Sequence, residues 1–156
     1  MGYKGKKVLV VADSVAIRQI IKKNLKELGF SELIEAENGA AGLKKAGEEP
    51  VDLIVSGWNM PNMTGLEFLK AVRADAGLKR IAFIMVTSEA DKEKIMEAVQ
   101  AGVDQYLVKP FNAMQLEEKI KAIKLWWIFY SAAVFSIGFG IAATGVSVPA
   151  FPAENI

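Results

Sequence analysis

The sequence predicts an α/β fold, a doubly wound five-stranded parallel sheet with helices on both faces. Two observations carry this prediction. Short apolar runs, which are typical of buried parallel strands, recur five times in the first 108 residues. Each run is followed by a stretch that reads as a helix from its apolar spacing or its end signals. Strands and helices that alternate in this way form parallel sheets through right-handed crossovers.

Capping residues and glycines set the expected ends of the helices. Asp13 and Ser14 can cap the first helix and Gly29 can end it, as Gly47 and Gly102 can end the second and the fourth. The expected strands cover residues 7–11, 32–36, 51–56, 81–87 and 105–108. The expected helices cover residues 15–28, 40–46, 66–73 and 91–101, with a last helix that Asn112 can cap.

Composition excludes several kinds of chemistry. The 156 residues contain no cysteine and no histidine, which rules out disulfides, thiolate chemistry, imidazole bases and the common zinc sites. The net charge of +1 and the lack of a basic helix argue against a nucleic-acid partner. No glycine-rich phosphate loop follows the first strand, so a nucleotide or hydride enzyme is not expected.

The expected functional site lies where the parallel strands end. In sheets of this kind, ligands bind beyond the carboxyl ends of the strands, at the switch in strand order. The strand assignment alone brings one group of residues to that edge: Ala12, Asp13, Gly57, Thr87, Ser88 and Lys109.

Four motifs give the chain a resemblance to a known family. They are VLVVADS, VDLIVSGWNMPNMTG, IMVTSEA and AGVDQYLVKPF, and they keep the family's spacing. With them, residues 6–124 resemble a response-regulator receiver domain of the CheY-like kind. The resemblance implies a flavodoxin-like sheet with strand order 2-1-3-4-5.

The resemblance also implies a role for each matching position. Receivers hold Mg²⁺ with two acidic residues after the first strand, where this chain has Ala12 and Asp13. Their phosphoacceptor aspartate matches Gly57. The remaining matches are the hydroxyl that contacts the phosphoryl group, the lysine that bonds to it and the aromatic switch residue, which are Thr87, Lys109 and Tyr106.

Two of these matches remove the family's chemistry. Gly57 supplies no nucleophile, and phosphoryl transfer to a protein needs one. Asp13 is the one carboxylate left for Mg²⁺, which prefers several oxygen ligands. We therefore expect a degenerate pseudo-receiver that is not an enzyme and has no phosphorylation, no tight metal site and no cofactor. Asp13 and Lys109 would remain as a pair of opposite charges that could form an ion pair.

Other readings of these positions stay open. Asn59 or Ser56 is a poor substitute nucleophile, and Ser56 should point to the opposite face of its strand. An ordinary phosphotransfer receiver whose acceptor was altered by engineering or drift is the main alternative. Tyr106 fits core packing as well as it fits a switch. Protein partners are expected on the face formed by the fourth helix, fifth strand and fifth helix, which receivers commonly use.

The tail after Lys124 has a different composition. Residues 125–148 carry no charge and are long enough to cross a bilayer core of about 30 Å. Trp126, Trp127 and Tyr130 would lie at the membrane interface, and the lysines before them would keep the receiver in the cytoplasm. The expected parts are a receiver over 1–124, a single membrane span over 125–148 and a short extracytoplasmic tail over 149–156.

Further expectations concern the span and its role. Small residues recur every four positions in it, which favours self-association: Ala132, Ser136, Gly140 and Thr144. A hydrophobic helix that packs on a soluble partner is the alternative to a span. Taken together, we expect a membrane-tethered pseudo-receiver that acts as a signalling or scaffolding module. In a third interpretation, the chain is an assembly protein whose function resides in the membrane span, and the receiver is a soluble cap.

Overall fold

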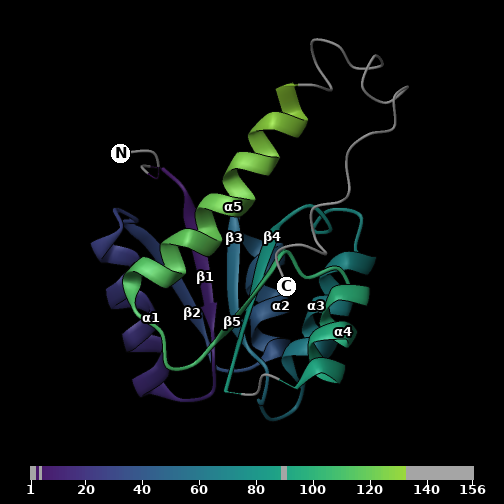
Figure 1. The fold of residues 1–156 in the computed structure, drawn as a ribbon. Coiled ribbons are helices and arrows are strands. Elements are labelled where there is room, and N and C mark those ends of the chain that lie inside the picture. Colours follow the sequence, from purple (N-terminus) through teal and green to yellow (C-terminus); the bar gives the residue numbers. More distant parts are fainter. Residues whose placement is uncertain (1–2, 4, 89–90, 133–156) are drawn as a thin grey trace.

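The computed structural model describes Tyr3 and residues 5–88 and 91–132, and it contains the predicted parallel sheet. All strand pairs are parallel, and the strand order is β2-β1-β3-β4-β5 (Figure 1). The strands are β1 (Lys7–Val11), β2 (Glu32–Ala36), β3 (Leu53–Gly57), β4 (Ala82–Thr87) and β5 (Gln105–Val108). The helices are α1 (Val15–Glu27), α2 (Gly39–Glu48), α3 (Gly65–Ala74), α4 (Lys92–Gln100) and α5 (Ala113–Ala132). The predicted five-stranded fold and its strand order are confirmed.

Two predicted boundaries are wrong by more than one residue. Strand β3 begins at Leu53, not at Val51. The residue before it, Asp52, is joined to the start of β1, since its backbone N–H donates to the Lys7 carbonyl at 2.9 Å. Helix α2 continues through Gly47 to Glu48. Gly47 does not have a positive φ, so it is an ordinary helical residue on the surface and no stop signal.

The side chains of the sheet alternate between two hydrophobic clusters. Leu9, Ile54 and Phe83 belong to the cluster under α2, α3 and α4, whereas their strand neighbours Val10 and Val55 belong to the cluster under α1 and α5. This period of two is what a sheet covered on both faces requires. The strands are therefore held from both sides, and their carboxyl ends are brought to one edge of the sheet.

Helix α5 connects the receiver-like part of the chain with the tail. Leu116 and Ile120 are buried against the sheet, and the helix continues past Lys124 to Ala132. It runs away from the carboxyl ends of the strands and projects beyond the opposite edge of the sheet (Figure 1). Within the part of the chain that the structure describes, no helix has the length and apolar character needed to cross a membrane.

Most of the predicted tail lies outside the described residues. Trp126, Trp127 and Tyr130 belong to the α5 backbone, but their side chains are not described. Ser136, Gly140 and Thr144, with residues 133–156 as a whole, lie beyond the described range. The span, its interface residues and the small-residue stripe therefore stay predictions.

Candidate functional site

A small pocket opens at the carboxyl ends of β1, β3, β4 and β5. Its volume is about 50 Å³. All five residues that the sequence predicts for the degenerate phosphorylation pocket line it, together with a set of neighbours from the same strand ends. The complete lining is Ala12, Asp13, Ile17, Ile21, Gly57, Trp58, Asn59, Val86, Thr87, Ser88 and Lys109.

The turn from β1 into α1 forms one wall of the pocket. Ala12 is buried and its N–H donates to the Ala36 carbonyl at 3.1 Å, whereas Asp13 is exposed. Ser14 is the N-cap of α1, since its Oγ accepts from the Ile17 N–H at 3.3 Å. Asp13 is therefore not needed as a cap, and it lines the pocket as an exposed residue.

Arg18 ties this wall to the neighbouring strand. Its Nη1 donates to the Ala12 carbonyl at 2.5 Å, and its Nε donates to Glu35 Oε1 at 2.9 Å. Lys22 Nζ donates to the other oxygen of Glu35 at 2.6 Å. The hydrogen bonds from Lys22 and Arg18 lower the pKa of Glu35. The sequence reasoning missed Arg18, although its position one turn after the expected helix cap Ser14 was the available signal.

Gly57 leaves an empty position at the centre of the pocket. A Cβ built on it would lie 3.8 Å from the Val11 carbonyl oxygen and 4.0 Å from Ala12 Cβ, which are ordinary contacts. Its backbone is not in the left-handed region, so the fold does not require glycine there. Ser56 is fully buried and its Oγ donates to the Gly57 carbonyl at 2.9 Å. It does not line the pocket, so it points away from it, as predicted.

Thr87 and Lys109 form the opposite wall. Thr87 is buried at the end of β4, and its carbonyl accepts from the Lys109 N–H at 2.8 Å. Lys109 is half-buried and precedes Pro110 through a cis peptide bond. No ion pair within 4.0 Å joins Asp13 to Lys109, both of which the structure describes. The predicted ion pair is wrong, because the two charges lie on opposite walls of the pocket.

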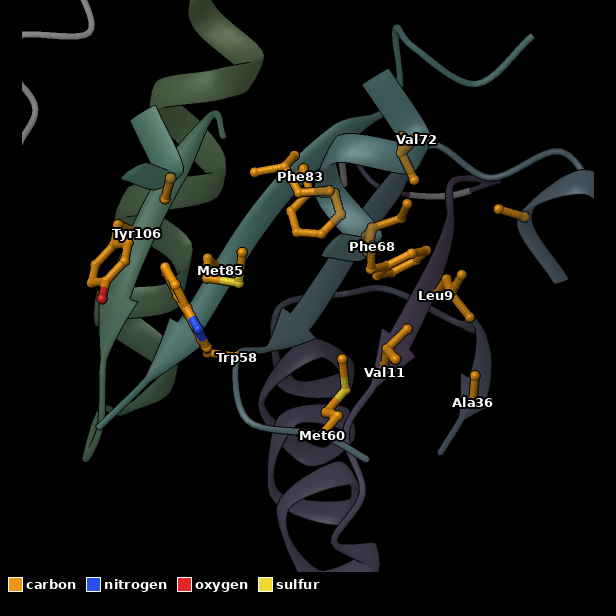
Figure 2. Close-up of a cluster of buried hydrophobic side chains, with 14 residues drawn as sticks. Leu9, Val11, Ala36, Trp58, Met60, Phe68, Val72, Phe83, Met85 and Tyr106 are labelled. Atoms are coloured by element: carbon orange, nitrogen blue, oxygen red, sulfur yellow. The ribbon is translucent and has the colours of Figure 1, made fainter. Parts of the chain in front are cut away.

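Trp58 links the pocket to the core and was missed from the sequence. It directly follows Gly57, lines the pocket and is 6% exposed. Its ring makes an edge-on contact with Tyr106, with 6.4 Å between ring centroids and 69° between planes (Figure 2). Lys94 Nζ lies 5.2 Å from the centroid of the Trp58 ring. Tyr106 is 8% exposed and packs in the same cluster, so it has a core-packing role.

The carboxylates of the pocket do not form a metal site. Among the described residues that line the pocket, Asp13 is the only acidic one, and Asn59 and Ser88 supply neutral oxygens. Among the described residues, no group of three or more acidic side chains is placed to hold a metal ion. Because Mg²⁺ needs near-octahedral oxygen coordination and is usually anchored by one or two carboxylates, this donor set fits it poorly.

The sequence of this chain is similar to those of known proteins. Residues 8–121 match the family described as the response regulator receiver domain. The chain belongs to the response regulator receiver family. This receiver is 48% identical over 117 residues to the chemotaxis protein CheY of Pseudomonas aeruginosa, which is 75% of this chain and 94% of that protein. It is 44% identical over 120 residues to the chemotaxis protein CheY-3 of Vibrio cholerae, which is 77% of this chain and 92% of that protein.

A solved structure supports the same assignment. The chemotaxis protein CheY4 of Vibrio cholerae matches with a TM-score of 0.71 at 40% identity, over 76% of this chain and 98% of that chain. The family match ends at residue 121, so the long uncharged tail lies outside it. A receiver domain is a signalling module, and the resemblance inferred from the four motifs is confirmed at this level.

Proposed function

We propose that this receiver is a non-phosphorylatable signalling or scaffolding module that binds protein partners and is tethered to a membrane. One observation carries the proposal. The strand position that faces Ala12 and Lys109 across the pocket is Gly57, which has no side chain to accept a phosphoryl group. Acceptance requires a nucleophilic carboxylate and a cation that offsets the incoming negative charge. Without the carboxylate and with Asp13 alone for a metal, the domain has no covalent step to perform.

The partner surface is the face formed by α4, β5 and α5. Each of these elements carries a well-exposed apolar side chain, namely Met96, Val108 and Met114. Tyr106 on β5 is turned into the core against Trp58, so it leaves this face open. A domain that cannot be phosphorylated has no signal to release Tyr106 from this packing. The face would then stay in one state, available to a chemotaxis-type protein, a histidine kinase or a membrane-bound assembly.

Tethering is proposed from the tail. Residues 125–148 are uncharged, and α5 leads into them from the edge of the sheet opposite the pocket (Figure 1). A single span there would hold the receiver on the cytoplasmic side, with its pocket directed away from the bilayer. Fractionation of cells that express the intact chain tests this: it should pellet with membranes and resist salt and carbonate extraction. Release by carbonate would contradict the span, and a chain truncated after Lys124 is the matched control.

An ordinary receiver with an altered acceptor is the second candidate. A side chain at position 57 would meet only ordinary contacts, and Asp13, Thr87 and Lys109 still line the pocket; with the 48% identity to a chemotaxis protein, these observations favour it. In this case the module would signal by phosphotransfer once its carboxylates were restored.

One experiment addresses both candidates. The unaltered chain and the double variant Ala12→Asp with Gly57→Asp are incubated with a small phosphodonor and Mg²⁺, and covalent phosphate is measured by intact mass. The unaltered chain should stay unmodified, and its phosphorylation would sink the main proposal. Phosphorylation of the double variant favours a recent alteration. An inert double variant favours a dedicated pseudo-receiver, and the single variant Ala12→Asp is the control without a nucleophile.

A further inference from the structure

Helix α5 passes from the receiver into the uncharged tail with almost no linker. Ile120 is buried, and Ile123 lines a small apolar pocket with Tyr3 and Phe30 at the amino edge of the sheet, where the strands begin. The uncharged segment starts at Leu125, only about 3 Å further along the helix axis. Because the headgroup layer is roughly 6 Å deep on each side of a bilayer core, the proposed span would hold this edge of the receiver against the lipid headgroups.

The end of α1 lies at the same edge. Helix α1 leads from the carboxyl end of β1 to the start of β2, so Lys23 and Lys26 in its second half lie toward the edge from which α5 projects (Figure 1). Phe30 follows α1 and stacks on Tyr3 with 4.3 Å between ring centroids. Both rings line the pocket that also contains Ile123, so the chain just after α1 is packed beside the last turn of α5 before the tail.

Helices α1 and α5 are basic, whereas the rest of the chain is acidic. Together they carry seven lysines and arginines and three glutamates, a net charge of +4, which leaves 12 basic and 15 acidic residues, or −3, for the remainder. Glu35 pairs with Arg18 and Lys22. Lys23 and Lys26 are exposed, and neither has an ion pair within 4.0 Å among the residues that the structure describes. Their charge is therefore available to a partner outside the receiver.

We propose that the amino edge beside α1 and α5 docks on an anionic lipid leaflet, with Lys23 and Lys26 in the headgroup layer. This inference rests on the proposed function, because the span places that edge at the bilayer. Each lysine near an anionic membrane surface strengthens the contact on the order of fivefold, within a Debye length of roughly 8 Å at physiological salt. The span keeps the receiver at the leaflet, so a weak attraction is enough to orient it. The pocket at the carboxyl edge then faces the cytoplasm.

Labelling of the full chain at single positions tests the proposal. The chain has no cysteine, so one introduced cysteine carries the only fluorophore. Ser31→Cys places it on an exposed residue next to Phe30, and Ala40→Cys places it on an exposed residue at the start of α2, near the opposite edge. Each labelled chain is reconstituted into vesicles of phosphatidylcholine, alone or with about 30% phosphatidylserine, that contain a lipid with a quencher on its headgroup.

The two labels should respond differently to phosphatidylserine. Quenching at residue 31 should increase with the anionic lipid and should return to the level of neutral vesicles in about 0.5 M salt, because the attraction is then screened. Quenching at residue 40 should not depend on the lipid composition. The dependence of quenching on the phosphatidylserine fraction gives an equilibrium constant for docking.

Two double variants locate the contact on α1. Lys23→Gln with Lys26→Gln should lower the docking constant by about tenfold or more, since each lysine contributes on the order of fivefold. Lys44→Gln with Lys70→Gln is the matched control, because it removes two exposed lysines from α2 and α3, which cover the other face of the sheet. Its docking constant should stay within about twofold, since charges more than a Debye length from the leaflet are screened.

Three results would overturn the proposal. These are equal quenching at residue 31 in the two lipid compositions, equal losses in the two double variants, and quenching that depends on the number of chains per vesicle but not on phosphatidylserine. The last result would assign the edge to a second copy of the chain.

Carbonate extraction of the same vesicles separates this inference from the proposed function. A chain that stays inserted but shows no response to phosphatidylserine refutes the lipid contact and leaves the tether intact. A chain that carbonate extracts refutes the tether, and the lipid contact with it, because no span then holds the amino edge at the bilayer.

Discussion

The charged side chains at the two edges of the sheet differ in how they are hydrogen-bonded. At the amino edge, where the strands begin, the Arg73 guanidinium donates four hydrogen bonds, and Asp104 accepts from both Arg73 Nη2 at 2.9 Å and the Phe83 N–H at 2.8 Å. At the carboxyl edge, Asp13 and Lys109 line one pocket without contacting each other. The partners of Arg73 are the carbonyls of Gly102, Lys79 and Ile81 and the carboxylate of Asp104.

The difference separates a cluster of charged groups that stabilises the fold from a pair that does not contact each other. Buried polar groups in folded proteins are satisfied unless a function requires otherwise. The amino edge follows this rule. From the end of α3, the Arg73 side chain donates to the Ile81 carbonyl just before β4 and to the Gly102 carbonyl shortly before β5. At the carboxyl edge, Lys109 is only half-buried, and none of the described side-chain hydrogen bonds or ion pairs involves its ammonium group.

The largest expected effect comes from Arg73→Ala. The substitution removes four hydrogen bonds, takes the Arg73 donor from three carbonyls and leaves the Asp104 carboxylate with the Phe83 N–H but without its cation. We expect a loss of about 2–4 kcal/mol of unfolding free energy. The melting temperature of the full chain, measured by circular dichroism in one detergent, should fall by roughly 10 °C. Arg80→Ala, at an exposed arginine, is the control. If Arg73→Ala and Arg80→Ala lowered the melting temperature equally, the Arg73 hydrogen bonds at the amino edge would not be important for stability.

Two glycines beside the pocket should respond in opposite directions. A Cβ on Gly65 would overlap the Gly57 carbonyl oxygen, so Gly65→Ala forces the loop after β3 apart and should cost about 1–3 kcal/mol. A Cβ on Gly57 makes only ordinary van der Waals contacts, and Gly57→Ala should stabilise the fold by about 0.4–1 kcal/mol by restricting the unfolded chain. Urea midpoints of both variants decide this. Destabilisation by Gly57→Ala would mean that the fold needs glycine there.

The sequence predicts much of this fold, and its failures have physical causes. Alternation of apolar runs places β1, β2 and β5 at their observed bounds, because both faces of the sheet are buried. The end of α2 was missed because Gly47 ends a helix only with a positive φ, which a sequence does not show.

Sequence reasoning on the site was limited in the same way. Strand ends bring Asp13 and Lys109 to one pocket, but topology places residues at an edge and does not set the distance between their charges. The contact between Trp58 and Tyr106 joins β5 to the loop after β3 and depends on side-chain rotamers. Residues 133–156 lie outside the described structure, so the span rests on composition alone.

A smaller effect is expected at Glu35, where the carboxyl edge is well paired. Its pKa is lowered, so the ionised form favours the native state; this stability is present above the unfolded pKa of about 4.3 and is lost as the pH falls through the lower native pKa. Burial raises the pKa of Asp104, which acts in the opposite direction. Glu35→Gln should cost about 0.5–1 kcal/mol at pH 7 and almost nothing at about pH 3. Urea unfolding at both pH values measures this, with Glu27→Gln, at an exposed glutamate, as the control.

The smallest expected effect is the response to magnesium, which should be close to zero. A ligand stabilises a fold only in proportion to its binding, and Asp13 alone offers Mg²⁺ a weak site. Magnesium at about 10 mM should change the unfolding free energy by less than about 0.1 kcal/mol relative to sodium chloride of equal ionic strength.

The double variant Ala12→Asp with Gly57→Asp supplies the contrast for this measurement. Three carboxylates would then share the pocket and repel one another, so the variant should be less stable than the unaltered chain without a divalent cation. If the double variant binds magnesium with a Kd of about 1 mM, magnesium at about 10 mM would raise its unfolding free energy by about 1.4 kcal/mol. A clear magnesium response in the unaltered chain would mean that Asp13 recruits other oxygens of the pocket. The carboxyl edge would then be a working metal site.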